Sequence, residues 1–439
     1  MPSPATCRRA DPAEQRHNQL AVVRRFEAAL WENGFNPALL ASYQAAWRRY
    51  QTLCGDDPSQ HAFLFIIPVA DSPAHLADCL ASLRHLAHAY AYGGQDADGR
   101  WRKLAVLLAD DSGQPEAIAR HQALAAELTA AGIATEYFGL AEQQALMQRL
   151  HGIDLSASLG THPPEAFHHK GQGMMRNLAY LRCAERLADS NVPTLLYTLD
   201  ADQAFRIKVD RTNGQDGPVE AAALNYLAEL DLLFRTHDID LLTGKVVGDP
   251  PVSPAVMAGH FLEDVLALVT DPRLAEGGAP YPQPGHQSGE AAYHDMANLF
   301  GFAADTGSYR YRCPLPGTAD NAACLAEFSR HLNGFFHGEH PTRVTWFEYQ
   351  PTAPSLLSAR TLYTGNAVFR PAALTWFIPF APLRLRMSGP TMGRMLKAAL
   401  GPRFASANLP MLHSRTRAET GQSEFRPGVV QHAEVDLSD

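Results

Sequence analysis

The chain has 439 residues, with 46 aspartates and glutamates against 37 lysines and arginines, for a formal net charge of −9. This balance argues against a nucleic-acid partner, which favours a basic face, although a local basic pocket can exist on an acidic protein. Hydrophobic residues make up 46% of the chain, so a sizeable core can be buried. The length fits one large α/β domain with an insertion, or two tightly joined domains.

Cysteine spacing and hydropathy exclude further classes. No two of the six cysteines form a CxxC pair, so zinc-ribbon and thioredoxin-like centres find no support, and reduced core cysteines are expected. The longest apolar runs, 63–70 and 372–383, are far shorter than the roughly 20 residues of a membrane-spanning helix. We therefore expect a cytoplasmic protein without a transmembrane segment.

The N-terminal 58 residues predict two helices. Apolar residues recur at helical spacing over 20–30 until Gly34 ends the run. A second helix fits residues 37–53, and the two together form an extension ahead of the first strand.

Strands alternate with helices four times in the next part of the chain. The strands are expected over 63–69, 104–109, 133–138 and 194–199. Such alternation predicts a mainly parallel sheet, and open parallel sheets bind ligands at the carboxyl ends of their strands. Acidic clusters follow the second and fourth strands, so we expect both at that edge.

Beyond residue 245 the composition changes. Residues 246–345 are rich in Pro, Gly and His around two expected helices, 255–268 and 290–302. We interpret this segment as an insertion that covers the site. Residues 416–439 form a polar tail for which little order is expected.

Asp200-Ala201-Asp202 places two carboxylates two residues apart, directly after a buried strand. In such a turn they can share a divalent cation, which would neutralise a diphosphate and act as a Lewis acid on a leaving phosphate. Taken alone, two aspartates at this spacing more often belong to a loop in which both side chains are solvated. The place of this pair after the fourth strand, with an acidic turn earlier in the chain, favours the metal site.

Two other segments have the chemistry of a nucleotide site. Asp110 and Asp111 follow the second strand and can accept hydrogen bonds from a ribose hydroxyl or a base N–H, although a turn with a helix cap uses the same residues. Lys170 and Arg176 flank glycines that lead into a helix, a pattern that suits a diphosphate, with solvated charges as the alternative.

Histidines give weaker signals. His168 and His169 could ligate a metal, but isolated histidine pairs are more often structural. His413, late in the chain, could complete the coordination of a cation, although a lone histidine usually has no such role.

In this order, the motifs resemble family 2-like glycosyltransferases of the GT-A superfamily. The resemblance covers about residues 60–245, resumes at Thr364–Arg370 and ends at a late histidine. The segments that carry it are Ile67-Pro68-Val69, Asp110-Asp111-Ser112, Lys170-Gly171 with Arg176-Asn177, Leu199-Asp200-Ala201-Asp202, Gly365-Asn366 and His413.

The resemblance implies a Rossmann-like α/β GT-A fold with a mainly parallel central sheet, to which the sequence pattern adds N-terminal helices and a helical or loop insertion. It implies a metal-dependent hexosyltransferase that moves a sugar from a nucleoside diphosphate sugar, UDP- or GDP-linked, to an acceptor with the help of Mn²⁺ or Mg²⁺. Sequence pattern and resemblance together divide the chain into an N-terminal extension (1–58), a nucleotide-sugar-binding half (59–245), an insertion expected to act as a lid (246–345), an acceptor-binding half (346–415) and a polar tail (416–439).

The resemblance also implies roles for single residues. Those that would bind the donor are Pro68, Asp110, Asp111, Lys170, Arg176 and Asp200. Those that would bind the cation are Asp200, Asp202 and His413. Those on the acceptor side are Gly365 and Asn366.

The chain departs from the family in two places. About 160 residues separate Asp202 from Gly365, an excess that matches the insertion. Inverting members place an acidic base soon after the Gly-Asn segment, but residues 383–394 contain no carboxylate. Because an inverting transfer needs a base near the acceptor hydroxyl, the candidates are Glu339 and Glu348, with Asp295 behind them. A retaining transfer would need none, so both stereochemical outcomes stay open.

Arg384 and Arg386 stand where that base is missing and could bind an acidic or phosphorylated acceptor, or could simply be solvated. Two other functions compete with sugar transfer. A nucleotidyltransferase usually has a glycine-rich basic signature after the first strand, where this chain has Ala70-Asp71-Ser72-Pro73. A non-catalytic sugar- or nucleotide-binding module on a degenerate GT-A fold is the second alternative.

Overall fold

The computed structural model describes residues 11–150, 152–159, 167–209, 218–248, 266, 268–282, 313, 315, 317–336, 346–377 and 388–414. The expected helix 290–302, most of the expected helix 255–268 and the tail 416–439 lie outside these residues. Within them, no helix is long and apolar enough to cross a membrane.

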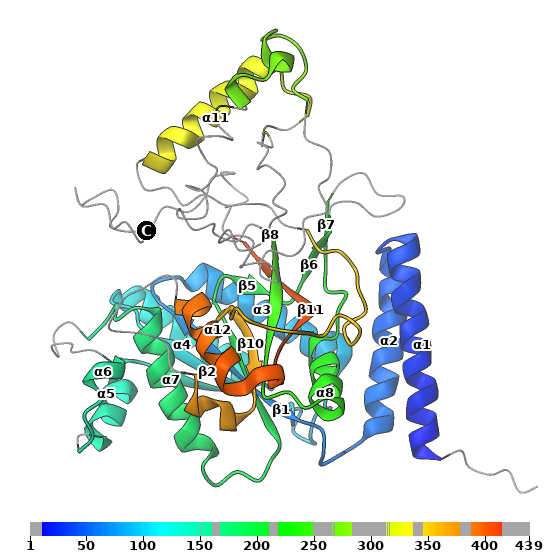
Figure 1. Ribbon diagram of the computed structural model, residues 1–439. Coiled ribbons are helices and arrows are strands. Elements are labelled where there is room, and N and C mark those ends of the chain that lie inside the picture. Colours follow the sequence, from blue (N-terminus) through cyan, green and yellow to red (C-terminus); the bar gives the residue numbers. More distant parts are fainter. Residues whose placement is uncertain are drawn as a thin grey trace, which may run out of the picture.

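A nine-stranded sheet forms the centre of the molecule (Figure 1). Its path is β3-β2-β1-β4-β10-β8-β11-β5, and β9 pairs with β11. The strands are β1 (Ala62–Val69), β2 (Leu104–Asp110), β3 (Ala134–Phe138), β4 (Thr194–Leu199), β5 (Gln203–Ala204), β8 (Leu241–Gly248), β9 (Leu357–Ser358), β10 (Asn366–Phe369) and β11 (Phe404–His413). A separate two-stranded sheet joins β6 (Ile207–Val209) to β7 (Val219–Ala221).

The sheet is mainly parallel, as the sequence predicts. β1 runs parallel to β2 and β4, β2 to β3, and β8 to β11. The short strand β10 is antiparallel to both of its neighbours, β4 and β8. The predicted α/β fold class is therefore confirmed, and each of the four strands predicted before residue 200 is present.

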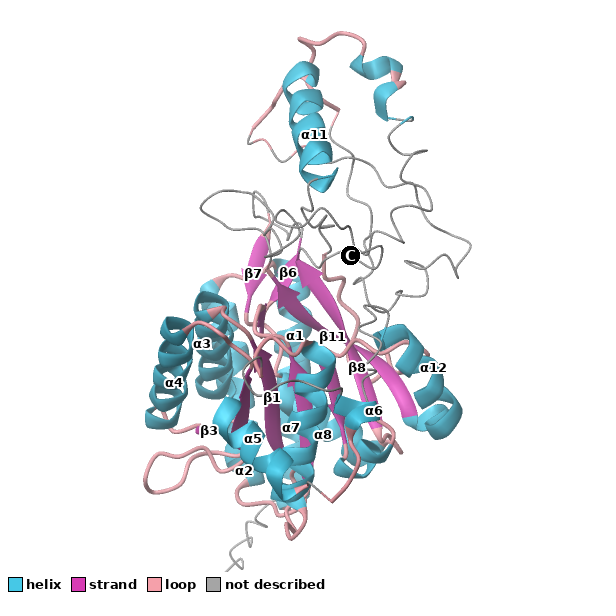
Figure 2. Cartoon of the chain, turned by 90° about the vertical axis from the view of Figure 1, so that its left-hand side faces the viewer, coloured by secondary structure: helices cyan, strands magenta, loops and turns pink. Residues whose placement is uncertain are grey.

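Helices cover both faces of the sheet (Figure 2). The helices in the described part of the chain are α1 (Pro12–Asn33), α2 (Pro37–Cys54), α3 (Pro73–Tyr90), α4 (Pro115–Ala130), α5 (Leu140–Arg149), α6 (Ser156–Leu159), α7 (Gln172–Leu187), α8 (Tyr226–Thr236), α11 (Asn321–Phe336) and α12 (Ser388–Leu400), of which α11 lies away from the sheet (Figure 1). Short 3-10 turns follow at η2 (Pro272–Leu274), η3 (Pro371–Thr375) and η5 (Gly401–Arg403). The first four helices each begin at a proline, whose fixed φ suits the first helical position.

Alternate residues of β1 divide the core into two layers. Phe63, Phe65 and Ile67 pack with α1, α2, α3 and α8, whereas Leu64 and Ile66 pack with α5, α6, α7 and α12. Because successive strand residues point to opposite faces, a continuous apolar run is what a strand covered on both sides requires.

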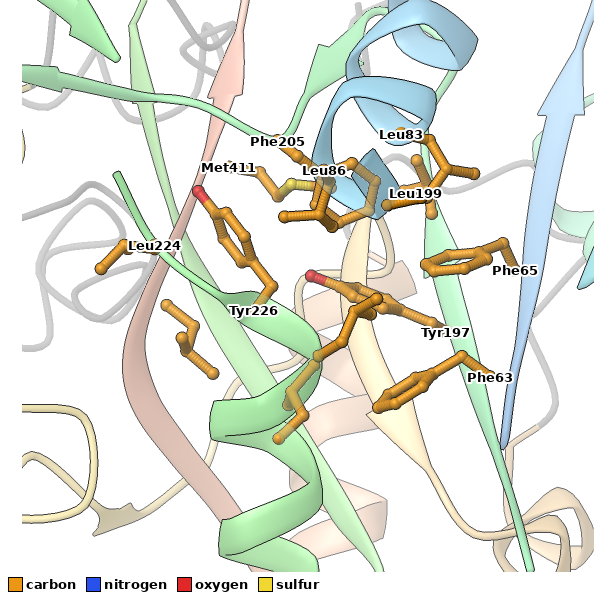
Figure 3. Packing of buried hydrophobic residues seen from close by; sticks show 14 of the residues in the cluster. Phe63, Phe65, Leu83, Leu86, Tyr197, Leu199, Phe205, Leu224, Tyr226 and Met411 are labelled. Atoms are coloured by element: carbon orange, nitrogen blue, oxygen red, sulfur yellow. The ribbon is translucent and has the colours of Figure 1, made fainter. Parts of the chain in front are cut away.

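Aromatic side chains fill the first layer (Figure 3). Tyr197 of β4 contacts Phe65 and Phe205 at ring-centroid distances of 5.6 and 5.8 Å, and these two rings also contact each other at 5.8 Å. Tyr226 of α8 packs edge-to-face on Phe205 and donates a hydrogen bond to the carbonyl of Pro410 in β11. The aromatic cluster thus joins the strands on which the site is built.

A buried charge cluster holds the N-terminal helices to the rest of the fold. Arg24 of α1 donates to both carboxylate oxygens of Glu229 in α8 and to Glu27 one turn away. Both carboxylates are almost fully buried. Burial and the neighbouring Glu229 raise the pKa of Glu27, although Arg24 opposes this rise.

One expectation about cysteines is wrong. Cys313 and Cys324, which is part of α11, form a disulfide across 11 residues. Cys54, Cys79 and Cys183 are free, as expected for core cysteines. Ser72 precedes α3, but its side chain donates to the carbonyl of Ala70 and does not cap the helix.

We predict that Arg24→Ala lowers the free energy of unfolding by about 2 kcal/mol, because it leaves two buried carboxylates without their cation. This loss is smaller than the usual cost of breaking a fully buried ion pair, because the Arg24 side chain is one-third exposed. Urea unfolding measures the change, and Arg25→Ala, an exposed neighbour on the same helix, is the control.

The loss should depend on pH. When the pKa of a carboxyl is raised in the folded state, the free energy of unfolding of the protein falls as the pH rises above the ordinary pKa of that group. The deficit of Arg24→Ala should therefore be larger at about pH 8 than at about pH 5, where Glu27 can take up a proton. Equal deficits at both pH values would contradict the charge explanation.

Candidate functional site

The carboxyl ends of β2, β1 and β4 lie side by side and carry the predicted acidic clusters. The register pairs Val69 of β1 with Asp110 of β2, and Ile66 of β1 with Thr198 of β4. Pro68 sits beyond the last β1–β4 pair, where its missing N–H removes no bond to β4. The structure therefore brings Pro68, the Asp110 turn and the Asp200 turn to one edge.

Asp202 and His413 meet because β5 pairs with the end of β11. His413 is directly opposite Gln203, the residue that follows Asp202. Ser414 donates its backbone N–H to the carbonyl of Asp202 at 3.2 Å. The Nε2 atom of His413 consequently lies 3.4 Å from Oδ2 of Asp202, although 211 residues separate them in sequence.

Asp200 is held by its own set of partners. Its carboxylate forms an ion pair with the buried guanidinium of Arg176, and its backbone N–H donates to Oε1 of Gln203 at 2.9 Å. Gln203 in turn donates to the hydroxyl of Tyr363 at 2.8 Å. A Cβ at Gly365 would lie 2.5 Å from Oδ2 of Asp200, so only glycine lets this loop approach so closely.

These contacts decide which side chains can hold a cation. Asp200 already faces Arg176, whereas Asp202 and His413 face each other and offer an oxygen and a nitrogen donor. In the described ranges, no three side chains among His, Cys, Asp and Glu gather as a metal site. The donor pair Asp202 and His413 fits a divalent cation whose other ligands would come from a diphosphate and water.

Asp110 makes four internal hydrogen bonds. It accepts from the backbone N–H and the hydroxyl of Ser112, lies 2.9 Å from Nδ1 of His121, and accepts from the hydroxyl of Tyr137 at 2.8 Å. Burial alone would raise its pKa, but hydrogen bonds from His121 and Ser112 outweigh it and leave the pKa below its usual value. The residues around Asp110 thus fix the turn after β2.

Asp111 and Lys170 form a second buried pair. Lys170 donates to the Asp111 carboxylate and to the carbonyl of Phe167, and Gly171 adds its backbone N–H at 3.2 Å. Burial raises the pKa of Asp111 despite the nearby cation and lowers the pKa of Lys170 despite the nearby carboxylate. The pair therefore ties the segment before α7 to the turn after β2.

The acceptor-side residues are placed unequally. Gly365 packs against Asp200, as described above. The side chain of Asn366 is buried among three strands and accepts from Tyr197, while its amide donates to the carbonyls of Lys245 and Leu409. Glu348 is exposed on the segment before β9, next to Phe347, whose backbone N–H donates to the carbonyl of Lys208 in β6. Glu339, Asp295, Arg384 and Arg386 lie outside the described residues.

Several residues of this edge had no signal in the sequence. Gln203 and Tyr363 join the Asp200 turn to the loop before β10, and His121 and Tyr137 hold Asp110. Each of these side chains is an ordinary polar residue in its local stretch. Only the pairing of distant strands reveals the contact.

Two solved structures show a partial likeness to the chain. The apo form of mouse xyloside xylosyltransferase 1 matches with a TM-score of 0.23 and 14% identity, over 47% of this chain and 59% of that one. Mannosyl-3-phosphoglycerate synthase from Rubrobacter xylanophilus matches with a TM-score of 0.25 and 13% identity, over 53% and 58%. The chain thus spans less than two thirds of the length of either.

Sequence comparisons add no family. No family model matches the chain, and no curated protein sequence matches it significantly. The interpretation of the site below therefore depends on its own residues and their contacts.

We predict that Asn366→Asp lowers the free energy of unfolding by about 2–4 kcal/mol, because a buried carboxylate would face two carbonyl oxygens in place of two donated hydrogen bonds. Urea unfolding measures the effect, with Asn18→Asp on the exposed side of α1 as the matched control. A variant of unchanged stability whose affinity for an acceptor falls would instead favour a direct acceptor contact.

Proposed function

We propose that the protein transfers a sugar from a nucleoside diphosphate sugar to an acceptor, with a divalent cation bound by Asp202 and His413. The observation that carries this proposal is the approach of these two side chains to 3.4 Å at the carboxyl edge of the sheet. Ligands of open α/β sheets bind at this edge. The carboxylate suits Mn²⁺ or Mg²⁺, and of these two Mn²⁺ accepts the imidazole more readily, because Mg²⁺ prefers oxygen ligands.

The charges around the site favour a role for the cation. Lys170 is paired with Asp111 and Arg176 with Asp200, so each predicted phosphate-binding cation already has an anionic partner. A diphosphate brings negative charge that these two neutral pairs do not fully balance. A bound cation would supply the missing positive charge and stabilise the leaving phosphate.

The residues around the cation would position the donor. Arg176 and Gln203 fix the side chain and the backbone of Asp200, which is proposed to accept a ribose hydroxyl beside the cation held by Asp202 and His413. Asp110 and Asp111, fixed by internal bonds, shape the turn that would hold the base and ribose, beside Pro68. We propose on this basis that residues 59–245 form the donor-binding half.

The acceptor would approach from the side of the loop before β10. Gly365 lies against Asp200 and Tyr363 is linked to it through Gln203, so this loop borders the proposed sugar position. Glu339 and Glu348 are the proposed bases for an inverting transfer. Arg384 and Arg386 are proposed to bind an acidic or phosphorylated acceptor, with residues 346–415 as the acceptor half and 246–345 as a lid.

We predict that Asp202→Ala lowers metal-dependent transfer or hydrolysis of the sugar nucleotide at least about 100-fold, because the cation loses its carboxylate ligand. The substrate is chosen first, by thermal shift with UDP, GDP, CDP and dTDP in the presence and absence of Mn²⁺. Turnover of the corresponding sugar nucleotide then measures the loss.

Asp189→Ala, which removes an exposed carboxylate just after α7, is the matched control and should keep full activity. Circular dichroism and urea unfolding check that Asp202→Ala keeps the fold. Full activity of Asp202→Ala would disprove the assignment. A wild-type protein that binds a nucleotide but never turns over its sugar derivative would favour a non-catalytic binding module.

A further inference from the structure

Three loops meet above the carboxyl ends of β1 and β2, and Asp71 connects them. Its Oδ1 accepts the backbone N–H of Gln114 at 3.0 Å, and its own backbone N–H donates to the hydroxyl of Ser112 at 2.8 Å. Its Oδ2 lies 2.6 Å from Nε2 of His169, in the segment before α7. His169 also donates its backbone N–H to the carbonyl of Asp111 at 3.0 Å.

Both partners of this contact have an unusual backbone. Asp71 has a φ of 45° and His169 a φ of 51°, and among the described non-glycine residues only Ala91 also has a positive φ. Such residues persist where surrounding contacts hold them, and they concentrate at functional sites. Here the hydrogen bonds to the turn after β2 supply those contacts, so the imidazole is fixed relative to both strands.

The contact with Asp71 also decides which nitrogen of His169 faces a ligand. A carboxylate can only accept, so the neutral imidazole keeps its proton on Nε2 and leaves Nδ1 as an acceptor. The side chain is 52% exposed while Asp71 is nearly buried, so the ring borders open space. Gly113 allows this arrangement, because a Cβ there would lie 3.2 Å from Nε2 of His169 and 3.0 Å from Nδ1 of His168.

We propose that His169, oriented by Asp71, is a specificity-determining residue that recognises the base of the donor nucleotide. The inference rests on the proposed function, which supplies the nucleotide. An acceptor nitrogen favours a base with a ring N–H at its hydrogen-bonding edge, which means uracil, thymine or guanine. Cytosine and adenine present a ring lone pair at that position, which opposes another lone pair.

The test is calorimetric binding of UDP, GDP, CDP and ADP to the full chain in the presence of Mn²⁺. The wild-type protein should bind UDP or GDP at least about 10-fold more tightly than CDP and ADP. This is the difference expected between a base that forms a hydrogen bond with Nδ1 and one that places a lone pair against it. His169→Asn should lower the affinity for the preferred nucleotide by about 5–10-fold and leave the affinities for CDP and ADP within about 2-fold of the wild-type values. Asparagine tolerates the same backbone conformation but is too short to reach the base.

Two further variants separate recognition from structure. In Asp71→Asn the amide can donate to Nε2, which moves the imidazole proton to Nδ1, so the preference for UDP or GDP should fall while His169 stays in place. His17→Asn, an exposed histidine on α1, should change nothing. Thermal unfolding of each variant shows whether the fold is kept.

Each outcome decides between the two proposals. If the wild-type protein binds no nucleotide, the proposed function fails and this inference with it. If the wild-type protein binds nucleotides and His169→Asn keeps the same preference, the inference fails and the proposed function stands. Preference of the wild-type protein for CDP or ADP, or an equal loss of all four nucleotides in folded His169→Asn, would likewise overturn the role of His169 in base recognition.

Discussion

One buried amide joins three strands from distant parts of the chain. Asn366 of β10 accepts from Tyr197 of β4 and donates to the carbonyls of Lys245 in β8 and Leu409 in β11. Without water to compete, leaving any of these groups unpaired would be costly. The edge of the sheet depends on this arrangement, because β10 directs the preceding glycine loop toward Asp200, and β11 continues to His413.

The first half of the fold could be predicted from the sequence because its signals are local. The apolar runs of β1, β2 and β4 and the prolines that begin α3 and α4 all lie within short windows. The positions of β10 and β11 have no such signal. β10 has four residues and pairs with strands that precede it by more than 100 residues, so its place depends on tertiary contacts alone.

The sequence motifs name the charged residues that lie at the candidate site, but they do not predict which of these residues contact one another. Asp202 and His413, which the sequence predicts to bind one cation, lie 3.4 Å apart because β5 pairs with the end of β11, and their role as metal ligands stays a prediction. The predicted phosphate-binding cations, in contrast, are paired with the predicted nucleotide-binding and metal-binding carboxylates, Lys170 with Asp111 and Arg176 with Asp200. A motif lists charged groups along the chain, whereas burial forces opposite charges to neutralise each other once the chain is folded.

The order of the strands has a consequence for how the protein is made. β11 is synthesised more than 150 residues after β8, yet it pairs with β8, β5 and β9. On the ribosome, β1, β2, β3 and β4 can assemble with their local helices while β8 and β5 still have open edges, and such edges are prone to wrong pairing with other chains. The segment that closes these edges also brings His413 to Asp202, so the sheet becomes protected from misassembly at the same step that completes the candidate site.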